Sequence, residues 1–537
     1  MCGIFCAIGD SSECRDNDVY SVQHRGPEET RIQCYNNEIG EKVLMAFHRL
    51  CINGVGDDSS AQPFIIGSVV LMANAEIYNH LELEKAHDIV PESKSDCEVI
   101  AHLYLLYGFR RTIELLDGEF AIVLYDRRMG ITYAARDRYG VRQLFVGTSN
   151  FPDDVYRRTI AIASEAKALT FLPKGWQIGP GTFLAISKDI VEEEWFSFVY
   201  PTTTHNRSTM TDTVHMLLIE AVRKRVECTE RPVGCLLSGG LDSSLITAIA
   251  SRILRDKGKY LQTFSIGMAG SPDLIAAEKV ANFCGTKHHA ILVTAEEALS
   301  VIPSIVYTTG SDDVTTNRAS TWHYLVCKYI RQNTDVKVVL SGEYADESFG
   351  SYAYFANAPS PKEFGEESLR LVRDIGYFDN LRSDHCISAW GLEGRIPYAD
   401  IHLMNYVMSI PPEEKMFTVD DSKMEKFILR SAFEHFLPPE ILWRRKNGFS
   451  DSVSPREESW SAIIGRYVDT IISDEEYDAC RGSFSPEPRT KEMFWYQKMH
   501  EQMYPEGHEL TPYQWIPKWC GDVIDPSARM LNICRAD

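Results

Sequence analysis

The most constraining feature of this sequence is a change of pattern near residue 200. Before that point, short runs rich in β-branched and aromatic residues are separated by turn residues, which is typical of strands. The runs are GIFCAI (3–8), VLMAF (43–47), SVVLMANAEIY (68–78), EFAIVLYD (119–126), ITYAAR (131–136) and IAIASE (160–165). One amphipathic helix is expected over residues 96–108, with Gly108 as its stop signal. The first 200 residues therefore predict a strand-rich α+β domain.

After residue 205 the sequence alternates between apolar strands and amphipathic helices. The expected strands are RPVGCLL (231–237), LQTFSIG (261–267), HHAILVT (288–294) and VKVVLSG (336–342), and the expected helices cover 244–255 and 273–285. Strands that alternate with helices predict an α/β domain with a parallel sheet, because parallel neighbours need crossover connections. The polar stretch YPTTTHNRSTM (200–210) lacks apolar periodicity and marks the expected boundary between domains at 1–200 and 205–537.

Composition argues against several classes of protein. The formal net charge of −21 disfavours binding to nucleic acid or to an anionic membrane surface. No apolar stretch is long enough to span a bilayer, and the start lacks the segments of a secretory signal. The 14 cysteines form no CxxC pair and no grouping with zinc spacing, so reduced thiols are expected. We therefore expect a soluble cytoplasmic protein with a sizeable core.

The chain opens with MCGIFCAIGD, which places Cys2 directly after the initiator methionine. One interpretation is that Cys2 is simply a small apolar residue. The other is that removal of Met1 leaves a free α-amino group beside the thiol, so that one residue supplies both a nucleophile and a base. The opening residues alone leave both interpretations standing.

The segment LLSGGLDSS (236–244) follows an expected strand and begins an expected helix. Glycines allow the backbone to approach a bound anion, and the amides at a helix start attract negative charge. The candidate phosphate-binding residues are Ser238, Gly239, Gly240, Ser243 and Ser244. Asp242 would repel a phosphate directly, so we expect it to hold a divalent cation instead. Because no GKS or GKT follows, this is not a Walker loop.

The SGGLDSS string resembles the pyrophosphate loop of ATP-pyrophosphatase enzymes, which cleave ATP between the α and β phosphates and transfer AMP. The opening residues and four further motifs resemble a class II glutamine amidotransferase domain: QHRGPEE (23–29), FHRLCI (47–52), NAEIYNH (74–80) and SDCEVI (95–100). The later motifs are GSPDLIAAEKVAN (270–282), DDVTTNRAS (312–320), VLSGEYADESFGSY (339–352), SAWGLEGRIP (388–397) and WRRKNGFSD (443–451). Over nearly its whole length the chain resembles the glutamine-hydrolysing asparagine synthetase family.

This resemblance implies a fold and a reaction. The implied fold is an N-terminal nucleophile sandwich, two antiparallel sheets between helices, followed by an α/β synthetase domain with a parallel sheet. In the implied reaction, glutamine releases ammonia, ATP converts the side-chain carboxylate of aspartate to β-aspartyl-AMP, and ammonia then displaces AMP to give asparagine. The small-molecule substrates are L-glutamine, L-aspartate and ATP, with Mg²⁺ as cofactor. Homodimers are common in the family, and an internal tunnel carries its ammonia.

In the glutaminase part the resemblance implies roles for individual residues. Cys2 is the nucleophile, and the side-chain amide of Asn74 stabilises the oxyanion beside the backbone N–H of Ala75. The family usually has glycine at position 75, so Ala75 is acceptable unless the position needs a positive φ. The implied glutamine-binding residues are Arg49, Leu50, Cys51, Ile52, Asn53, Asn74, Ala75, Glu76 and Asp96. Arg49 is expected to hold the substrate carboxylate, and Asp96 and Glu76 its ammonium, although a structural role for Glu76 stays open.

In the synthetase part the implied ATP-binding residues are Leu237, Ser238, Gly239, Gly240, Asp242, Ser243, Ser244, Ile266, Ser341 and Gly342. Asp242 and Asp346 are expected to hold magnesium. Glu343 matches the family carboxylate linked to forming and consuming the aspartyl intermediate. Lys446 matches a lysine that neutralises phosphate charge during adenylation.

The clearest departure from the family is Tyr344, where glycine is usual. We expect its ring to point away from the aspartate pocket and to pack against the helical C-terminal part, so that the site stays intact. Two alternatives remain: a relative that closes a β-lactam ring, and a non-catalytic scaffold. Relatives that close a β-lactam ring tend to lose the N-terminal cysteine and to carry tyrosine at the position of Glu343. Cys2 and Glu343 disfavour that alternative, and the intact pyrophosphate loop disfavours the scaffold.

Overall fold

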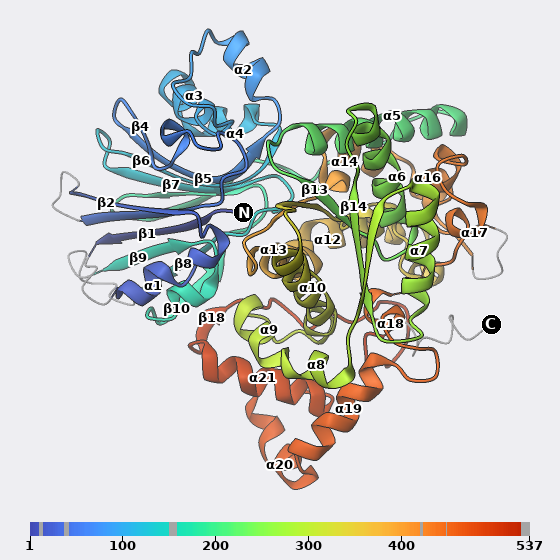
Figure 1. Cartoon of the computed structure of the whole chain (residues 1–537). Coiled ribbons are helices and arrows are strands. Elements are labelled where there is room, and N and C mark those ends of the chain that lie inside the picture. Colours follow the sequence, from blue (N-terminus) through green and yellow to red (C-terminus); the bar gives the residue numbers. More distant parts are fainter. Residues whose placement is uncertain (10–13, 37–41, 150–157, 419–422, 447, 528–537) are drawn as a thin grey trace.

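The computed structural model describes residues 1–9, 14–36, 42–149, 158–418, 423–446 and 448–527. A sandwich of strands from the first 200 residues lies beside a helix-rich part built around a parallel sheet (Figure 1). The N-terminus lies between these two parts (Figure 1). Met1 is 1% exposed, and its amino nitrogen donates a hydrogen bond of 3.0 Å to the carbonyl of Leu392. The start of the chain is therefore buried at the interface.

The first sheet of the sandwich has seven strands in the order β18-β10-β8-β9-β1-β3-β2. They are β18 (Gly507–Glu509), β10 (Lys174–Gln177), β8 (Phe145–Thr148), β9 (Thr159–Ala163), β1 (Gly3–Gly9), β3 (Lys42–Arg49) and β2 (Glu29–Asn36). Neighbours are antiparallel except β10 and β18, which are parallel. Because β18 comes from the C-terminal half, the sheet includes a strand that the division at 200–205 did not predict.

The second sheet is antiparallel throughout, in the order β12-β11-β7-β6-β5-β4. Its strands are β12 (Ile190–Glu194), β11 (Thr182–Ile186), β7 (Ile131–Arg136), β6 (Gly118–Asp126), β5 (Val69–Ile77) and β4 (Phe64–Ile66). Alternate side chains of β5 take opposite faces, as the two-residue repeat of a strand requires. Val70 and Met72 pack between the sheets, whereas Leu71 and Ala73 pack in the core under the helices.

Several short helices cover the sandwich, where the sequence predicted one. They are α1 (Asp16–Tyr20), α2 (His80–Ala86), α3 (Val99–Tyr107) and α4 (Phe109–Leu115). The expected helix at 96–108 corresponds to α3, which begins at Val99. Gly108 ends it with φ of 78°, as predicted, but α4 starts at the next residue. A glycine at this angle ends one helix and redirects the chain into another.

The parallel sheet has the order β15-β14-β13-β16-β17. Its strands are β15 (Lys287–Leu292), β14 (Gln262–Gly267), β13 (Val233–Leu236), β16 (Val338–Leu340) and β17 (Glu393–Arg395). The four predicted strands are confirmed. The sequence did not predict β17, because the segment Glu-Gly-Arg carries no apolar run.

Helix boundaries in this part follow local capping chemistry. The helix α7 (Pro272–Cys284) begins after Ser271, whose side chain accepts a hydrogen bond from the Leu274 N–H, and ends at Gly285 with φ of 68°. The helix α5 (Arg207–Glu227) begins after Asn206, which caps it in the same way. The polar stretch at 200–210 is thus irregular up to Asn206 and then forms the first turn of α5.

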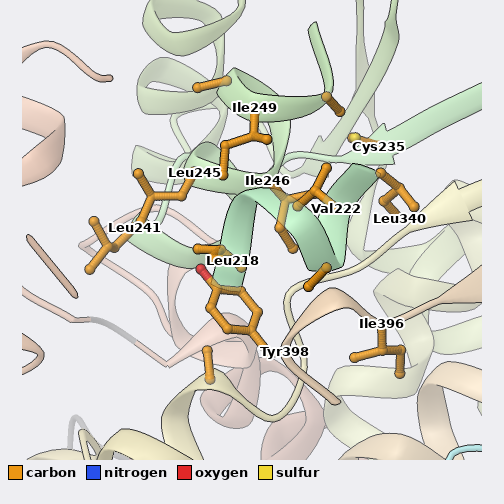
Figure 2. Packing of buried hydrophobic residues seen from close by; sticks show 14 of the residues in the cluster. Leu218, Val222, Cys235, Leu241, Leu245, Ile246, Ile249, Leu340, Ile396 and Tyr398 are labelled. Carbon is orange, nitrogen blue, oxygen red and sulfur yellow. The ribbon is translucent and has the colours of Figure 1, made fainter. Parts of the chain in front are cut away.

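One buried cluster joins the helices to the parallel sheet (Figure 2). Leu218 and Val222 of α5 pack with residues of α6 (Leu241–Asp256) and with Leu340 of β16. The remaining helices are α8 (Ala295–Ser300), α9 (Ile302–Thr309), α10 (Val314–Asn333), α11 (Ala345–Phe349), α12 (Pro361–Asp374), α13 (Asp379–Ser388), α14 (Ile401–Ser409), α15 (Pro412–Lys415), α16 (Phe427–Ala432), α17 (Pro439–Leu442), α18 (Phe449–Ser452), α19 (Trp460–Ile471), α20 (Asp474–Cys480) and α21 (Lys491–Met503). The packing of α5 and α6 against Leu340 of β16 fixes the ends of these strands, where the second site forms.

Candidate active sites

The first site lies where the two sheets of the sandwich bring Cys2 and Asn74 together. The Cys2 N–H donates to Asn74 Oδ1 at 2.8 Å, and the Leu50 N–H donates to Cys2 Sγ at 3.4 Å. The amide nitrogen Nδ2 of Asn74 is buried and has no hydrogen-bond partner among the described residues. An unused amide donor beside a thiol is an arrangement that could stabilise a developing oxyanion.

Burial sets the ionisation of the thiol. It raises the pKa of Cys2 to about 11, although the positive chain terminus opposes the shift. Burial also lowers the pKa of the Met1 amino group to about 6, although Glu393 opposes it. An amine in these surroundings is therefore largely neutral near pH 7, so it can act as a base.

The predicted glutamine-binding residues gather at the loop after β3, in which Leu50 contacts this thiol. Asn53 Nδ2 reaches both predicted ammonium ligands, at 3.5 Å from Glu76 Oε2 and 3.4 Å from Asp96 Oδ1. The Arg49 guanidinium donates to the carbonyls of Gly54 at 2.9 Å and Asp57 at 3.3 Å. The structure thus brings these candidates together around one loop.

Two of these candidates differ in their partners. Glu76 Oε2 lies 2.7 Å from Arg395 Nη2 of β17, and burial raises the pKa of Glu76 well above its usual range although Arg395 opposes the shift. Asp96 Oδ2 accepts from the Ile77 N–H at 2.7 Å, and Asp96 has no ion pair with a described residue. Ala75 lies within β5 opposite Phe120 of β6, so its position does not require a positive φ.

The neighbouring residues Leu50, Cys51 and Ile52 are buried, and they take part in this site through their backbone. The Cys51 N–H donates to Glu28 Oε2 at 2.7 Å, while the Ile52 carbonyl accepts from the Glu230 N–H at 3.3 Å. These contacts hold the loop between the sandwich and the start of the parallel-sheet part.

The second site is a cavity of about 240 Å³ at the carboxyl ends of β13, β14 and β16. The predicted residues that line it are Leu237, Ser238, Gly240, Asp242, Ser243, Ile266, Ser341, Gly342, Glu343, Asp346 and Lys446. Leu237 and Ile266 contribute apolar surface to its lining. Ligand sites at this edge of a parallel sheet are the general rule.

The loop between β13 and α6 is fixed by its own serines and by close packing. Ser238 Oγ lies 3.1 Å from Ser243 Oγ and accepts from the Gly240 N–H at 3.3 Å. Gly239 has φ of 74°, and a Cβ there would lie 2.5 Å from the Cβ of Ala276. Gly239 and Ser244 do not line the cavity, because Gly239 faces α7 and Ser244 is completely buried.

Paired charges occupy the floor of this cavity. Lys426 Nζ lies 2.6 Å from Asp242 Oδ2 and 2.5 Å from Asp346 Oδ1, and Lys446 Nζ lies 2.5 Å from Asp346 Oδ2. Burial alone would raise the pKa of Asp346, but the two lysines outweigh it and hold that pKa well below its usual range. Lys426 was not predicted, because nothing in its sequence neighbourhood distinguishes it from a surface lysine.

The residues present fit a magnesium ion. Asp242 Oδ1 is buried and has no hydrogen-bond partner among the described residues. Carboxylate oxygens are the ligands that Mg²⁺ prefers, and this ion is often held by one or two carboxylates together with substrate phosphates. No group of three or more His, Cys, Asp and Glu side chains able to hold a metal is found in the described part of the chain.

At the end of β16, Glu343 faces two partners. Its Oε1 lies 3.0 Å from Arg382 Nη2 and accepts from Ser341 Oγ at 3.4 Å. Burial raises the pKa of Glu343 to about 7, although Arg382 opposes the shift. The Ser341 N–H donates to the Arg395 carbonyl at 3.1 Å, so the residue that pairs with Glu76 also contacts the second site.

The ring of Tyr344 points away from the cavity, as predicted, but its partner is different. Tyr344 is 0% exposed, and its hydroxyl donates to the carbonyl of Tyr139 at 2.8 Å. Tyr139 belongs to the sandwich, so the hydrogen-bond partner of the hydroxyl was not predicted. The buried cluster that contains Tyr344 also includes Val372 and Leu403 of the helical C-terminal part, as expected.

The structure adds cavity residues to which the sequence analysis gave no role, although three of them lie within its motifs. They include Ala319, His323, Arg382, Arg444, Phe449, Trp515 and Ser527. Arg444 fixes the phosphate loop, since it donates to the Gly239 carbonyl at 3.0 Å and pairs with Asp273 at 2.8 Å. Segments far apart in the chain therefore close the site, which no local pattern could reveal.

Comparison with known proteins gives matches over both parts of the chain. Family models match over residues 1–195 (glutamine amidotransferase domain) and over 213–369 and 356–522 (asparagine synthase). Glutamine-hydrolyzing asparagine synthetases from Gallus gallus and Mus musculus are 37% and 36% identical to the chain, and each match covers 99% of both sequences. The Homo sapiens protein of that description is 36% identical over 99% of both chains. Among the described residues, no helix combines the length and apolar character needed to cross a membrane.

Proposed function

The chain belongs to the glutamine-hydrolysing asparagine synthetase family, and from that premise we propose how its residues divide the reaction. The enzyme makes asparagine from aspartate with nitrogen taken from glutamine, and ATP is a substrate. One observation carries the residue-level proposal: a partly buried thiol lies beside an unused amide donor, in a site separate from the cavity of paired aspartates and lysines. We assign glutamine hydrolysis to the first site and aspartate activation to the second.

In the glutaminase reaction, removal of Met1 frees the α-amine of Cys2, which takes the thiol proton. The sulfur attacks the side-chain carbonyl carbon of glutamine, and Asn74 Nδ2 with the Ala75 N–H stabilises the oxyanion. The C–N bond breaks as the amide nitrogen receives the proton and leaves as ammonia. Water then hydrolyses the thioester to glutamate and restores the thiol.

Substrate glutamine carries a carboxylate and an ammonium that the site must hold. Arg49 is the candidate for the carboxylate, because a guanidinium can bind it through two parallel hydrogen bonds. Asp96 is the stronger candidate for the ammonium, since Glu76 already pairs with Arg395. Glu76 then completes the ammonium site from a position set by Arg395.

In the synthetase reaction, the side-chain carboxylate of aspartate attacks the α-phosphorus of ATP, and pyrophosphate leaves. Ammonia attacks the resulting β-aspartyl-AMP, and AMP leaves with an oxygen from the original carboxylate. We propose that Lys426 and Lys446 exchange their aspartate partners for phosphate oxygens. Bound Mg²⁺, held by Asp242 and Asp346, would neutralise phosphate charge. Glu343 and Arg382, which pair at 3.0 Å, are the candidates for positioning the aspartyl group.

Three further points belong to the proposal. We propose two domains, a glutaminase domain over 1–200 and a synthetase domain over 205–537. The end of β12 at Glu194 and the start of α5 at Arg207 support this boundary. Residues 528–537 lie outside the described residues. A homodimer and a cytoplasmic location are supported by the family resemblance. Sedimentation of the purified chain and imaging of a tagged chain test these two points.

A labelling experiment tests the activation step. The enzyme is supplied with glutamine, ATP, magnesium and aspartate that carries ¹⁸O in its side-chain carboxylate, and the products are analysed by mass spectrometry. We expect asparagine, glutamate, pyrophosphate and AMP that contains ¹⁸O. Label in inorganic phosphate with formation of ADP would contradict adenylation, and an absence of asparagine would contradict the assigned reaction.

A further inference from the structure

Tyr344 occupies a backbone position that side chains other than glycine rarely adopt. It lies in the turn between β16 and α11 with φ of 71°. Residues in this region persist where surrounding contacts over-determine them, and they concentrate at functional sites. The preceding residue, Glu343, lines the cavity, whereas Tyr344 is completely buried behind it. The strained turn thus joins a reacting surface to the protein interior.

The hydroxyl of Tyr344 leaves the synthetase part and reaches the sandwich. It donates to the carbonyl of Tyr139 at 2.8 Å, and Tyr139 lies just after β7. The two tyrosines belong to one buried cluster that also contains Val141. A hydrogen bond in such surroundings is protected from water and has a single geometry.

The receiving loop, residues 137–142, is itself rigid. The Asp137 carboxylate accepts from the N–H groups of Tyr139 at 3.1 Å, Val141 at 2.9 Å and Arg142 at 3.0 Å. From the synthetase side, Asn380 Nδ2 donates to the carbonyls of Gly140 and Val141, each at 2.9 Å. Tyr344 therefore binds a fixed point.

The same loop is connected to the first site. Ala75 pairs with Phe120 across β5 and β6, and the Phe120 N–H donates to Asp137 Oδ2 at 3.1 Å. A continuous series of backbone pairing and hydrogen bonds thus leads from the strand of Asn74 to the loop, and from the loop through Tyr344 to the Glu343 turn. Each step is a contact within a packed core, which transmits displacement.

We propose that Tyr344 is a positioning residue that couples ammonia release to ammonia capture; the inference rests on the function proposed above. Ammonia that meets bulk water near neutral pH becomes ammonium, which is not a nucleophile. Efficient transfer therefore requires the Glu343 turn to be in place when the first site releases ammonia. The Tyr344 hydroxyl holds this turn in register with the glutaminase loop.

The test compares Tyr344→Phe with Tyr104→Phe. Tyr104 is a matched control, because its buried hydroxyl donates to Asp126 Oδ2 at 2.9 Å entirely within the sandwich. The readouts are the glutaminase rate, synthesis from added ammonium, and the ratio of asparagine to glutamate when glutamine is the nitrogen source. We expect the ratio to fall about threefold in Tyr344→Phe alone, while the first two rates stay within about twofold of the parent.

A parent-like ratio in Tyr344→Phe would overturn the proposal, and so would an equal loss of all three readouts, which indicates a purely structural role. If Tyr344→Phe does not fold, Tyr344→Gly replaces it, since glycine accepts the positive φ and still removes the bond. The same fall in ratio is expected there, and an unchanged ratio again contradicts the proposal. A parent enzyme that makes no asparagine would instead refute the proposed function.

Discussion

At the edge of the sandwich the sulfur of the reactive thiol has only backbone hydrogen-bond partners among the described residues, whereas in the cavity of the second part the reactive surface consists of paired charges. Cys2 contacts Asn74 and the backbone of Leu50, and burial raises its pKa to about 11. In the cavity, Lys426 and Lys446 compensate Asp242 and Asp346 at contact distance. The same burial therefore has different consequences in the two sites.

The difference follows from what each site must bind. Glutamine hydrolysis creates one negative charge on one oxygen, so a single free amide and a base suffice. ATP brings several charges, and a site that held bare lysines would be costly to bury without it. In the proposed mechanism the aspartates compensate these lysines before ATP binds and then release them to the phosphates. Loss of a single atom, the sulfur of Cys2, should therefore abolish the activity of the first site. The activity of the second site should fall when one of its paired charges is removed.

The largest effect is expected from Cys2→Ala, which separates the two sites completely. Without the sulfur no thioester forms, so glutamine hydrolysis should fall by at least about 1000-fold. Synthesis of asparagine from added ammonium should continue, because the cavity is unchanged. The two rates are measured in parallel as glutamate and asparagine formed. Hydrolysis at the parent rate would remove Cys2 from the role of nucleophile, and intact Met1 in the active enzyme would remove its α-amine as the base.

The opposite result is expected from Asp242→Ala, in which the synthetase reaction is lost and glutamine hydrolysis is kept. Loss of this carboxylate removes a metal ligand and leaves Lys426 with one partner, so AMP formation should fall by about 100-fold or more. Glutaminase activity should persist, since Asp242 belongs to the other half. Asp242→Asn is the matched variant that keeps the shape of the side chain and removes the charge. Equal loss of both half-reactions would point to misfolding, and an unchanged yield of AMP would remove Asp242 from the site.

The two lysines should differ in importance. Lys426 contacts both aspartates, whereas Lys446 contacts one, so Lys426→Met should lower aspartate-dependent exchange of pyrophosphate into ATP by about 10- to 100-fold. Lys446→Met should have the smaller effect of the two. Isotope exchange measures both variants, and thermal melting controls for folding. A larger loss in Lys446→Met would reverse the proposed ranking and identify Lys446 as the main phosphate ligand.

The smallest effect concerns pH. Because burial raises the pKa of Glu343 to about 7, the carboxylate is charged above that pH and protonated below it. Its ion pair with Arg382 therefore forms as pH rises, and exchange should increase by roughly five- to tenfold between pH 6 and pH 8. Glu343→Gln should lack this inflection. A profile that keeps the same inflection in Glu343→Gln would assign the titration to another group.

Much of the architecture could be predicted from the sequence. The strands at 233–236, 262–267 and 287–292 agree with their apolar runs, and the Ser-Pro start and Gly end of α7 agree with capping chemistry. The predictions failed where the signal is not local. The strand β17 is three residues without an apolar run, and β18 pairs with a strand more than 300 residues earlier.

The candidate sites show the same limit. Cys2, Asp242 and Glu343 lie in motifs, so the sequence indicated them. Lys426 has no motif around it, because its importance comes from where the chain folds back onto α6 and α11. The charge of Glu76 depends likewise on Arg395, a residue more than 300 positions away. Tyr344 is a third case. The sequence showed that a tyrosine replaces the usual glycine, but it did not show that the hydroxyl binds Tyr139 across the interface.

The central claim is that nitrogen released at Cys2 is consumed in the cavity of the same chain. The most direct measurement supplies glutamine labelled with ¹⁵N in its side-chain amide together with unlabelled ammonium, and then determines ¹⁵N in the asparagine produced. We predict strongly labelled asparagine from the parent enzyme and unlabelled asparagine from Cys2→Ala. Asparagine from the parent that carries only the isotopic composition of the free ammonium would contradict the account.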